Sequence, residues 1–295
     1  MDWDKLRIFH AVAEAGSFTH AGDVLNLSQS AVSRQISALE EALQVPLFHR
    51  HARGLILTEQ GEAMNRTVRE VFAKLAMTEA LLTESKEKAA GRLKVTTTTG
   101  FGTAWLAPRL PRFLEQHPDI SIALILEDSD LDLGMREADV AIRMHPPRQP
   151  DLVQRHLTTI QLPLCASEDY LARNGTPATI EDLDNHRIVL FGSYHPPAQD
   201  MNWLAMLGRV AGQAKRQPVL EVNSVTAMTD AIEAGLGIGA LPHYMLTDRP
   251  KLQRVLTEVK APSVEAFFVY PEELRTSKRV AVFRDFLLAE IAGRS

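Results

Sequence analysis

The sequence contains only one cysteine, Cys165, in 295 residues. A single cysteine excludes an intramolecular disulfide framework and any zinc site built on several cysteines. No stretch approaches the roughly 20 apolar residues that a membrane-spanning helix needs. The first residues, Met1 to Asp4, have neither the basic start nor the apolar core of a secretory signal. We therefore expect a cytoplasmic protein without a membrane partner.

Motifs for catalysis are also missing. There is no G-x-S-x-G and no phosphate-binding loop, and the ten histidines show no metal-ligand spacing. The glycine-rich stretch 235–239 follows a predicted helix and precedes a predicted strand, which reverses the order of a dinucleotide site. Cys165 lies in an apolar, strand-like run, where a small buried hydrophobe is the usual role. We predict a protein that is not an enzyme and has no cofactor and no metal.

The composition is that of a globular protein of two or three domains, with 45% hydrophobic and 23% charged residues. The net charge of -5 gives no sign of a nucleic-acid binder. Residues 1–61 hold five Lys and Arg against seven Asp and Glu. Their cations nevertheless cluster between Arg34 and Arg53, so that a local basic patch is compatible with an acidic total.

Three short helices are predicted before residue 44. Asp4 is a plausible cap for the first, which Gly16 ends, and Ser17 or Thr19 can cap the second. Ser28 caps a third helix that runs to about residue 43. Its apolar residues fall on one stripe, which we expect to be buried: Val32, Ile36, Leu39 and Leu43.

The opposite face of the third helix is polar and short-chained, and it has no carboxylate before Glu40. Its members are Gln29, Ser30, Ser33, Arg34 and Ser37. Small hydroxyls allow close approach to a DNA major groove, where Gln and Arg can read base edges. The alternative is a solvated face, although such a face usually mixes Glu and Lys in i,i+4 pairs.

The next segment predicts a β-hairpin wing. Apolar residues 46–48 and 55–57 flank the basic turn His49-Arg50-His51-Ala52-Arg53-Gly54. Arg50 and Arg53 would contact the phosphate backbone, which sets position rather than sequence.

Residues 6–61 resemble the LysR-type transcriptional regulators. The resemblance rests on Ala21-Gly22, Ser28-Gln29-Ser30-Ala31-Val32-Ser33, Leu39-Glu40, Leu47-Phe48-x-Arg50 and Leu57-Thr58-x-x-Gly61. Gly22 departs from the alanine of many members. The resemblance implies that the polar face of the third helix reads promoter DNA and that dimers bind paired half-sites. Within this family, the sequence looks most like the alphaproteobacterial LsrB/VtlR-like branch. This narrower resemblance rests on residues 2–6, the wing and residues 182–187.

A long linker helix is predicted after the cap Thr58, with a hinge at residues 88–92 and an end at Gly91. Its apolar positions alternate at spacings of four and three, as in a coiled coil: Met64, Val68, Val71, Leu75, Thr78 and Leu82. We interpret this seam as the surface that contacts the same helix of a second copy of the chain. The alternative is that the helix packs on its own domain. The predicted domains are therefore 1–58 for DNA binding, 59–91 for the linker and 92–295 for a sensor.

The sensor alternates strands and helices, which favours α/β lobes with mostly parallel sheets. Predicted strands lie at 93–99, 120–126, 140–144, 162–166, 187–191, 219–222, 238–241 and 266–270. Predicted helices lie at 104–116, 168–174, 202–210, 225–234 and 277–292. A crossing near 162–166 and a return near 266–270 indicate two lobes, at about 92–162 with 267–295 and at 163–266. The full fold prediction is α/β with an all-α N-terminal part, and it resembles the family's bilobed periplasmic-binding-protein-like effector domain.

Ligands of such lobes sit at strand C-termini and helix N-termini. The candidate contacts are Thr98, Thr99, Gly100, Phe101, Gly102, Thr103, Arg143, Asn223, Ser224 and Thr226. Their hydroxyls and free N–H groups could hold a carboxylate or phosphate, so we expect an anionic effector. Two structural alternatives stay open: Asn223 or Ser224 as a helix cap, and an Arg143 salt bridge within the acidic segment 127–132.

The expected function is promoter binding as a dimer of dimers, with an effector between the lobes that alters DNA bending and recruitment of RNA polymerase. Three alternatives remain. An enzyme would need a catalytic or cofactor motif, and none stands out in the sequence. A periplasmic solute-binding protein would have no use for the first 60 residues. A DNA-binding protein whose second domain only oligomerises is not excluded by the sequence, and a ligand-binding screen would distinguish it.

Overall fold

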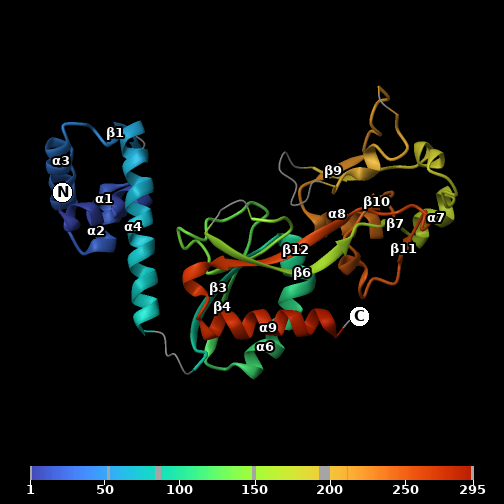
Figure 1. The fold of residues 1–295 in the computed structure, drawn as a ribbon. Coiled ribbons are helices and arrows are strands. Elements are labelled where there is room, and N and C mark those ends of the chain that lie inside the picture. Colours follow the sequence, from blue (N-terminus) through green and yellow to red (C-terminus); the bar gives the residue numbers. More distant parts are fainter. Residues whose placement is uncertain are drawn as a thin grey trace. The chain divides into compact units, whose positions relative to one another are not determined.

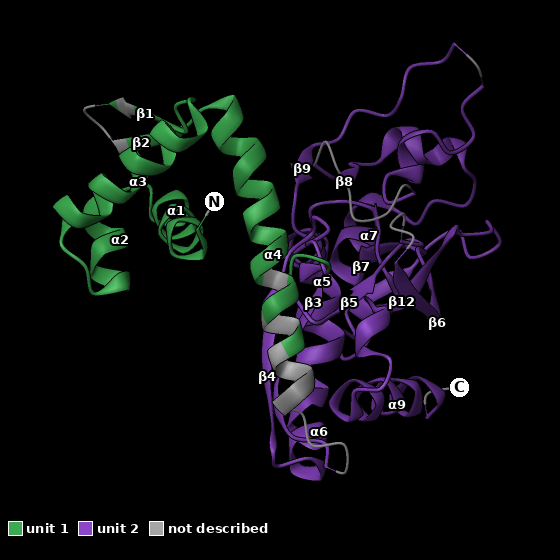
Figure 2. Cartoon of the chain, turned by 60° about the vertical axis from the view of Figure 1, so that its left-hand side comes forward, with its two compact units in different colours: residues 1–83, 134–136 green, residues 84–133, 137–295 purple. Residues whose placement is uncertain are grey.

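The computed structural model describes residues 2–51, 54–83, 88–147, 151–192, 200–210 and 212–293. The chain divides into two compact units (Figures 1 and 2). Unit 1 comprises Met1–Thr83 with Gly134–Arg136, and unit 2 comprises Glu84–Leu133 with Glu137–Ser295. Each unit is described by itself.

Unit 1 contains the predicted three helices and hairpin. Its elements are α1 (Trp3–Ala15), α2 (Phe18–Leu25), α3 (Gln29–Leu43), β1 (Phe48–His51), β2 (Gly54–Leu57) and α4 (Glu59–Thr83). Ser17 and Ser28 cap α2 and α3, as expected. The cap of α1 is Asp2 and not Asp4, because the Asp2 side chain accepts from the Asp4 N–H. Gly16 ends α1 in the left-handed conformation with φ 60°, which glycine adopts without strain.

The core of unit 1 is formed by the apolar faces of its helices together with residues at the start of the hairpin. It consists of Ile8, Phe9, Val12, Ala21, Val32, Ile36, Leu39, Leu47, Phe48 and Val68. Three of the four predicted stripe residues of α3 are buried in it, but Leu43 is 37% exposed. Leu43 is the last residue of α3, where the helix leaves the core. The prediction that it is buried was wrong.

Part of the predicted seam of the linker helix α4 packs on its own unit. Thr58 caps the helix, because its hydroxyl accepts from Gly61 N at 3.0 Å. Val68 is buried in the unit 1 core and Met64 packs against that core, contrary to the prediction of a pure dimer seam. Val71 and Leu75 remain exposed, and the Leu82 side chain lies outside the described residues.

The end of the linker helix was predicted too late in the chain. Gly91 does not end a helix but begins the first strand of unit 2, and it adopts φ 98° there. Residues 91 and 92 of the predicted hinge are therefore part of a sheet.

The first lobe of unit 2 is a five-stranded sheet in the order β4-β3-β5-β12-β6. Its strands are β3 (Gly91–Thr97), β4 (Ile120–Leu126), β5 (Val140–Arg143), β6 (Leu152–Gln161) and β12 (Ser263–Pro271). β3 runs parallel to β4 and β5, whereas β12 is antiparallel to β5 and β6. The sheet is thus mixed rather than mostly parallel, since the two strands that cross between lobes pair with each other.

The second lobe has a three-stranded sheet, β10-β7-β11, and a parallel pair, β8-β9. Its strands are β7 (Leu164–Ser167), β8 (Val189–Phe191), β9 (Leu220–Val222), β10 (Gly239–Ala240) and β11 (Leu252–Arg254). A parallel bridge between Ile188 and Ile238 connects the two parts. Cys165 is fully buried in β7, as expected.

The helices of unit 2 differ from the predictions at two places. The helical elements are α5 (Thr99–Phe101), the π-helix η1 (Gly102–Leu106), η2 (Ala107–Arg109), α6 (Leu110–Gln116), α7 (Glu168–Asn174), η3 (Glu181–Asn185), η4 (Trp203–Ala205), α8 (Val225–Glu233), η5 (His243–Leu246), η6 (Glu272–Leu274) and α9 (Lys278–Ala292). The first helical run begins at Thr99, five residues before the predicted start. The predicted helix 202–210 is one 3₁₀ turn followed by a loop.

Two strands of unit 2 were not predicted, β6 and β11. The middle of β6 is exposed at residues 154–156, so its sequence lacks the apolar pattern of a buried strand. Among the described residues, no helix is long and apolar enough to cross a bilayer.

Candidate nucleic-acid interface and ligand cleft

The N-terminus of α3 presents the polar face that the sequence predicted. The Ser28 hydroxyl accepts from Ala31 N at 3.2 Å and lies 3.1 Å from the Ser30 hydroxyl. Gln29, Ser30, Arg34 and Ser37 are exposed and Ser33 is half-buried. Because Val32 and Ile36 fill the core on the other side, this face cannot turn inward without losing the core. The structure thus brings the five α3 candidates together on one exposed surface.

Glu40, the first carboxylate of the α3 polar side, binds within unit 1. Its Oε1 accepts from Leu47 N at 2.7 Å and from Phe48 N at 3.1 Å. Hydrogen bonds to a charged acceptor are among the stronger ones in proteins. This carboxylate therefore ties α3 to the start of the hairpin, and its charge is partly compensated there.

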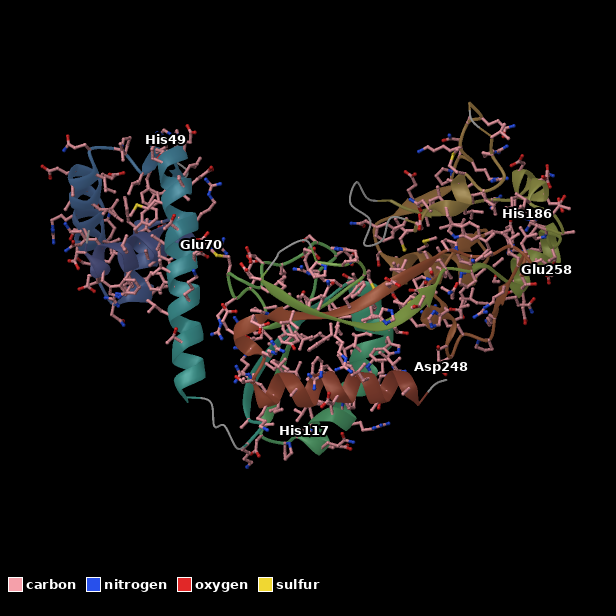
Figure 3. The ribbon with its side chains drawn as sticks, viewed as in Figure 1. His49, Glu70, His117, His186, Asp248 and Glu258 are labelled. Atoms are coloured by element: carbon pink, nitrogen blue, oxygen red, sulfur yellow. The ribbon has the colours of Figure 1, made fainter. Side chains whose placement is uncertain are left out.

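The hairpin forms as predicted, with β1 antiparallel to β2 from the pair Phe48 and Leu57 to the pair His51 and Gly54. His49 and His51 are exposed on β1, with ring centroids 6.1 Å apart (Figure 3 labels His49). The Arg50 side chain and the whole of Arg53 lie outside the described residues.

In unit 2, two strand-to-helix junctions from different lobes meet. The junction after β3 begins α5 at Thr99, and the junction after β9 begins α8 at Val225. A Cβ added to Gly100 would lie 3.0 Å from the Cβ of Val225 and 3.5 Å from the Tyr244 hydroxyl. The two lobes are therefore in van der Waals contact at this point, and glycine is what allows the approach.

A carboxylate faces this junction. Asp128 follows β4 and accepts from Thr99 N at 2.9 Å, so one of the free helix N–H groups already has an anionic partner. Tyr244, on η5 of the second lobe, is buried beside it. Burial, and secondly the Asp128 charge, raise the pKa of Tyr244, which keeps its hydroxyl protonated as a donor.

The space at the junction of Gly100 and Val225 is small in this structure. A cavity of about 20 Å³ is lined by Thr98, Gly100, Asp128, Met144, Ile160, Leu162, Met201, Val225, Pro242, Tyr244 and Val264. Such a volume holds about one water molecule. A larger ligand at this junction requires the lobes to separate there.

The ten predicted effector contacts do not converge on this cavity. Thr98 and Gly100 line it, but Arg143 lines a different cavity and is engaged elsewhere. The Arg143 guanidinium pairs with Asp130 at 3.2 Å and donates to Leu131 O at 2.8 Å. The structural alternative raised for this residue is thus the arrangement observed.

The remaining predicted contacts have other local roles. Ser224 caps α8 by accepting from Ala227 N at 3.3 Å, while Asn223 is exposed. Phe101 is buried against Trp105 and Tyr244, and Gly102 packs on Leu126. Thr103 donates its hydroxyl back to the Thr99 carbonyl.

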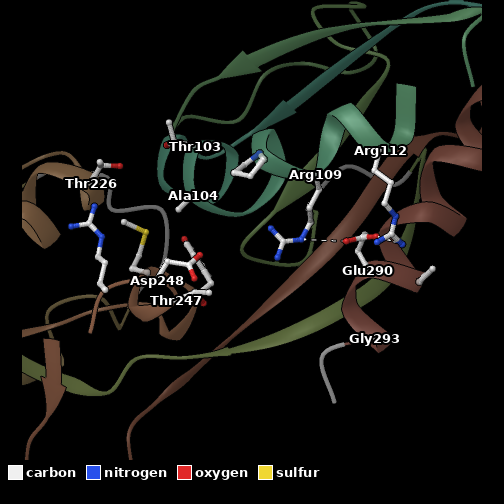
Figure 4. Close-up of a pocket in the computed structure, with 14 residues that line it drawn as sticks. Thr103, Ala104, Arg109, Arg112, Thr226, Thr247, Asp248, Glu290 and Gly293 are labelled. Atoms are coloured by element: carbon white, nitrogen blue, oxygen red, sulfur yellow. Dashed lines mark ion pairs between the residues drawn. The ribbon is translucent and has the colours of Figure 1, made fainter. Parts of the chain in front are cut away.

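Thr103 and Thr226 line a separate pocket of about 740 Å³ (Figure 4). Its two cations on α6 and η2 are already paired, because Glu290 of α9 lies 2.6 Å from Arg112 and 3.5 Å from Arg109. The Arg109 guanidinium also stacks over the Trp105 ring at 4.5 Å. A third arginine of this wide pocket, Arg249, pairs with Asp230 and Glu233, so each of its three arginines has a carboxylate partner.

Sequence reasoning missed several residues that line the small cavity, notably Asp128, Met144, Met201 and Tyr244. Asp128 and Tyr244 follow predicted strands at their carboxyl ends, so the same strand-end rule that selected Thr98 could have found them. Met144 ends the predicted strand 140–144 and carries the same signal, whereas Met201 does not. No group of three or more potential metal ligands occurs in the described parts of the chain.

Family models match nearly the whole chain. Residues 3–62 match "Bacterial regulatory helix-turn-helix protein, lysR family", and residues 86–292 match "LysR substrate binding domain". An exposed recognition helix with a wing, followed by a bilobed α/β unit, defines a class of DNA-binding regulators with a ligand-binding domain. The chain belongs to the LysR family of transcriptional regulators.

Named relatives agree with this assignment. An HTH-type transcriptional regulator of Haemophilus influenzae is 31% identical, covering 91% of this chain and 94% of its own. CrgA of Neisseria meningitidis is 30% identical, covering 98% and 97%. The solved CrgA structure matches with a TM-score of 0.62 at 29% identity, covering 99% of each chain. CbnR, solved in complex with its target DNA, shares the fold with a TM-score of 0.67 at 22% identity, covering 100% of each chain.

Proposed function

We propose that α3 and the β1-β2 wing bind promoter DNA. The observation that carries this proposal is the exposed α3 face, where Gln29, Ser33 and Arg34 lie together while Glu40 is held by the Leu47 and Phe48 N–H groups. Arg34 can read a guanine through two hydrogen bonds, and Ser30 and Ser37 allow close approach. Arg50 and Arg53 bind the phosphate backbone in this proposal.

The regulator is proposed to act as a homodimer that assembles into a homotetramer. Exposed Val71 and Leu75 on α4 supply the apolar part of the dimer contact, while the Met64 and Val68 side of the helix serves the unit 1 core. Promoter DNA and RNA polymerase are then the macromolecular partners, and both belong to the cytoplasm.

The effector is proposed to bind between the two lobes of unit 2, where Thr98, Gly100 and Val225 meet. An anionic effector has to compete with Asp128 for the Thr99 N–H, since two anions would otherwise face each other at one helix start. Displacement of the Asp128 carboxylate would then accompany binding and lobe opening. Ser224 and Thr226 are the corresponding candidates on the second lobe, and the other predicted contacts, Arg143 included, remain candidates only if opening frees them.

Genome-wide footprinting tests the proposal with three proteins: the wild type, Arg34→Ala and Arg7→Ala. Arg7 is a matched cation of unit 1, in an exposed pair with Asp4 at 3.7 Å that contributes little stability. We expect discrete promoter sites with paired half-sites for the wild type and Arg7→Ala, and loss of these sites for Arg34→Ala. Folded wild-type protein without enriched sites, or an unchanged Arg34→Ala footprint, would contradict the proposal.

A further inference from the structure

Another pocket of unit 2 lies at the opposite end of the β8-β9 pair from the cleft. β8 and β9 run parallel, and the carboxyl end of β9 leads to Val225 at the cleft. At their amino ends, a pocket of about 440 Å³ is lined by Leu183, Asp184, His186, Ile188, Arg209, Gln213, Ala214, Lys215, Arg216 and Gln217. We propose that this pocket binds a phosphate group, either free phosphate or a phosphate monoester. It is separate from the proposed effector site.

The lining is cationic. It contains three cations, Arg209, Lys215 and Arg216, and one carboxylate, Asp184. The lining therefore carries two net positive charges at neutral pH. Asp184 is shared by both arginines, with Oδ1 2.7 Å from Arg209 Nη2 and 2.8 Å from Arg216 Nε. One carboxylate cannot neutralise three cations, so the site retains attraction for an anion.

The two arginines have different roles. Arg216 is buried and donates to the carbonyls of Ile180, Leu204 and Leu207, so that it holds the pocket wall in place. Arg209 is less committed. Its Nη1 and Nη2 bind Asp184, but its Nε is buried and has no hydrogen-bond partner among the described residues. Each Nη also carries a second proton that Asp184 does not take, and these are the protons that an anion in the pocket can accept.

His186 adds a neutral donor. The Tyr170 hydroxyl accepts from Arg187 N at 2.9 Å and lies 3.1 Å from His186 Nδ1. That hydroxyl also has one proton of its own, which it can donate to Nδ1, and the imidazole proton then resides on Nε2. Burial lowers the pKa of His186, which favours the neutral ring. In this tautomer His186 offers the pocket a ring N–H donor (Figure 3 labels His186).

Phosphate suits this lining better than a carboxylate does. A phosphate monoester carries nearly two negative charges at pH 7 and has three strong acceptor oxygens. Two net positive charges match that charge, and the Arg209, Lys215 and His186 donors match the number of oxygens. A monocarboxylate would leave one charge and one donor without a partner.

Isothermal titration calorimetry on the full-length protein at pH 7.5 tests the proposal, with inorganic phosphate and glycerol 3-phosphate as probes. We expect saturable binding of one anion per chain, weakened at least about tenfold by Lys215→Gln and by Arg209→Gln. The Lys215 side chain is exposed, so its variant is expected to fold even if Arg209→Gln is destabilised. Lys260→Gln removes an exposed lysine of the same lobe that does not line the pocket and should bind like the wild type.

The outcomes separate the sources of the ligand and the two pockets. If glycerol 3-phosphate binds more tightly than inorganic phosphate, the ligand is a monoester. If inorganic phosphate binds more tightly, the ligand is free phosphate, and either result supports the site. Three outcomes overturn the phosphate site. Acetate binds as tightly as phosphate, no saturable binding is seen, or Lys215→Gln binds phosphate as tightly as the wild type does. Gly100→Ala, which crowds the cleft, should leave phosphate affinity unchanged. A loss in that variant would assign the anion to the cleft and also overturn the proposal.

Discussion

Replacement of the buried Arg216 by methionine is expected to destabilise unit 2 substantially. The wild-type side chain is 5% exposed and makes four short contacts, to Asp184 at 2.8 Å and to the Leu204, Leu207 and Ile180 carbonyls at 3.2, 2.6 and 3.2 Å. Methionine keeps the packing of the aliphatic stem but removes every donor.

Breaking one side of a buried ion pair costs about 3–5 kcal/mol. The Asp184 side chain is 43% exposed and keeps its pair with Arg209, so the Arg216→Met loss is reduced by solvent screening to about 2–4 kcal/mol. For a unit of this size each kcal/mol lowers Tm by about 2–4 °C, which predicts a decrease of roughly 4–16 °C.

Differential scanning calorimetry and urea unfolding of the full-length protein measure this change. Arg216→Lys should fall between the wild type and Arg216→Met, because an ammonium keeps the charge but lacks the planar fork. Lys215→Gln, at the neighbouring exposed position, should stay within about 0.5 kcal/mol. A loss below about 1 kcal/mol for Arg216→Met would refute the idea that this residue holds the loop after η4 in place.

Four further predictions concern binding, reactivity and pH. Arg34→Lys should weaken operator binding about 5–150-fold in fluorescence anisotropy and relax base preference, because lysine cannot make the bidentate contact; equal affinity would mean a phosphate contact only. Asp128→Asn should raise the affinity for an anionic effector in calorimetric titrations, and lower affinity would argue against competition at the helix start. Burial raises the pKa of the Cys165 thiol to about 12, so Ellman's reagent should react only after unfolding in guanidinium. Burial, and secondly Arg254, lower the pKa of His243, so the unfolded chain takes up a proton near pH 6.5 while the folded chain does not. Stability should therefore fall as pH decreases below about 6.5, and His243→Gln should reduce this fall in urea unfolding.

The sequence predicted unit 1 well because its signals are local. Caps such as Ser17 and Ser28, and an apolar stripe at helical spacing, are properties of a few neighbouring residues. The polar face of α3 follows from the same periodicity, since the residues opposite a buried stripe must be exposed. Glu40 shows the limit of this reasoning, because its partners at Leu47 and Phe48 depend on how the hairpin folds back.

Unit 2 was harder because its pairing is not local. β6 has exposed polar residues in its middle and is held as a strand by β12, about a hundred residues later in the chain. The start of the first helical run was predicted late for a different reason. Two glycines at 100 and 102 argue against a helix, yet here they permit contact with Val225 and Leu126. Tertiary packing overrides the local preference at both places.

The effector residues were selected by one rule, that ligands gather where strands end and helices begin. Of the residues that it selected, Thr98 and Gly100 line the small cavity where the lobes meet. It could not show that Asp130 holds Arg143, or that Thr226 lines another pocket, because strand order and side-chain direction decide these contacts.

The connection between the lobes limits how an effector can act. Only two crossings join them in the described part of unit 2, from β6 to β7 and from β11 to β12. These crossings are themselves paired, because Gln161 lies opposite Ser263 and Leu162 N donates to Pro262 O at 3.0 Å. They must therefore bend together as one hinge. Because the cavity at Thr98 and Gly100 holds about one water, an effector that binds there has to change the hinge angle rather than only local side chains. Its effect on the free energy of DNA binding can be no larger than its preference for one lobe angle over the other.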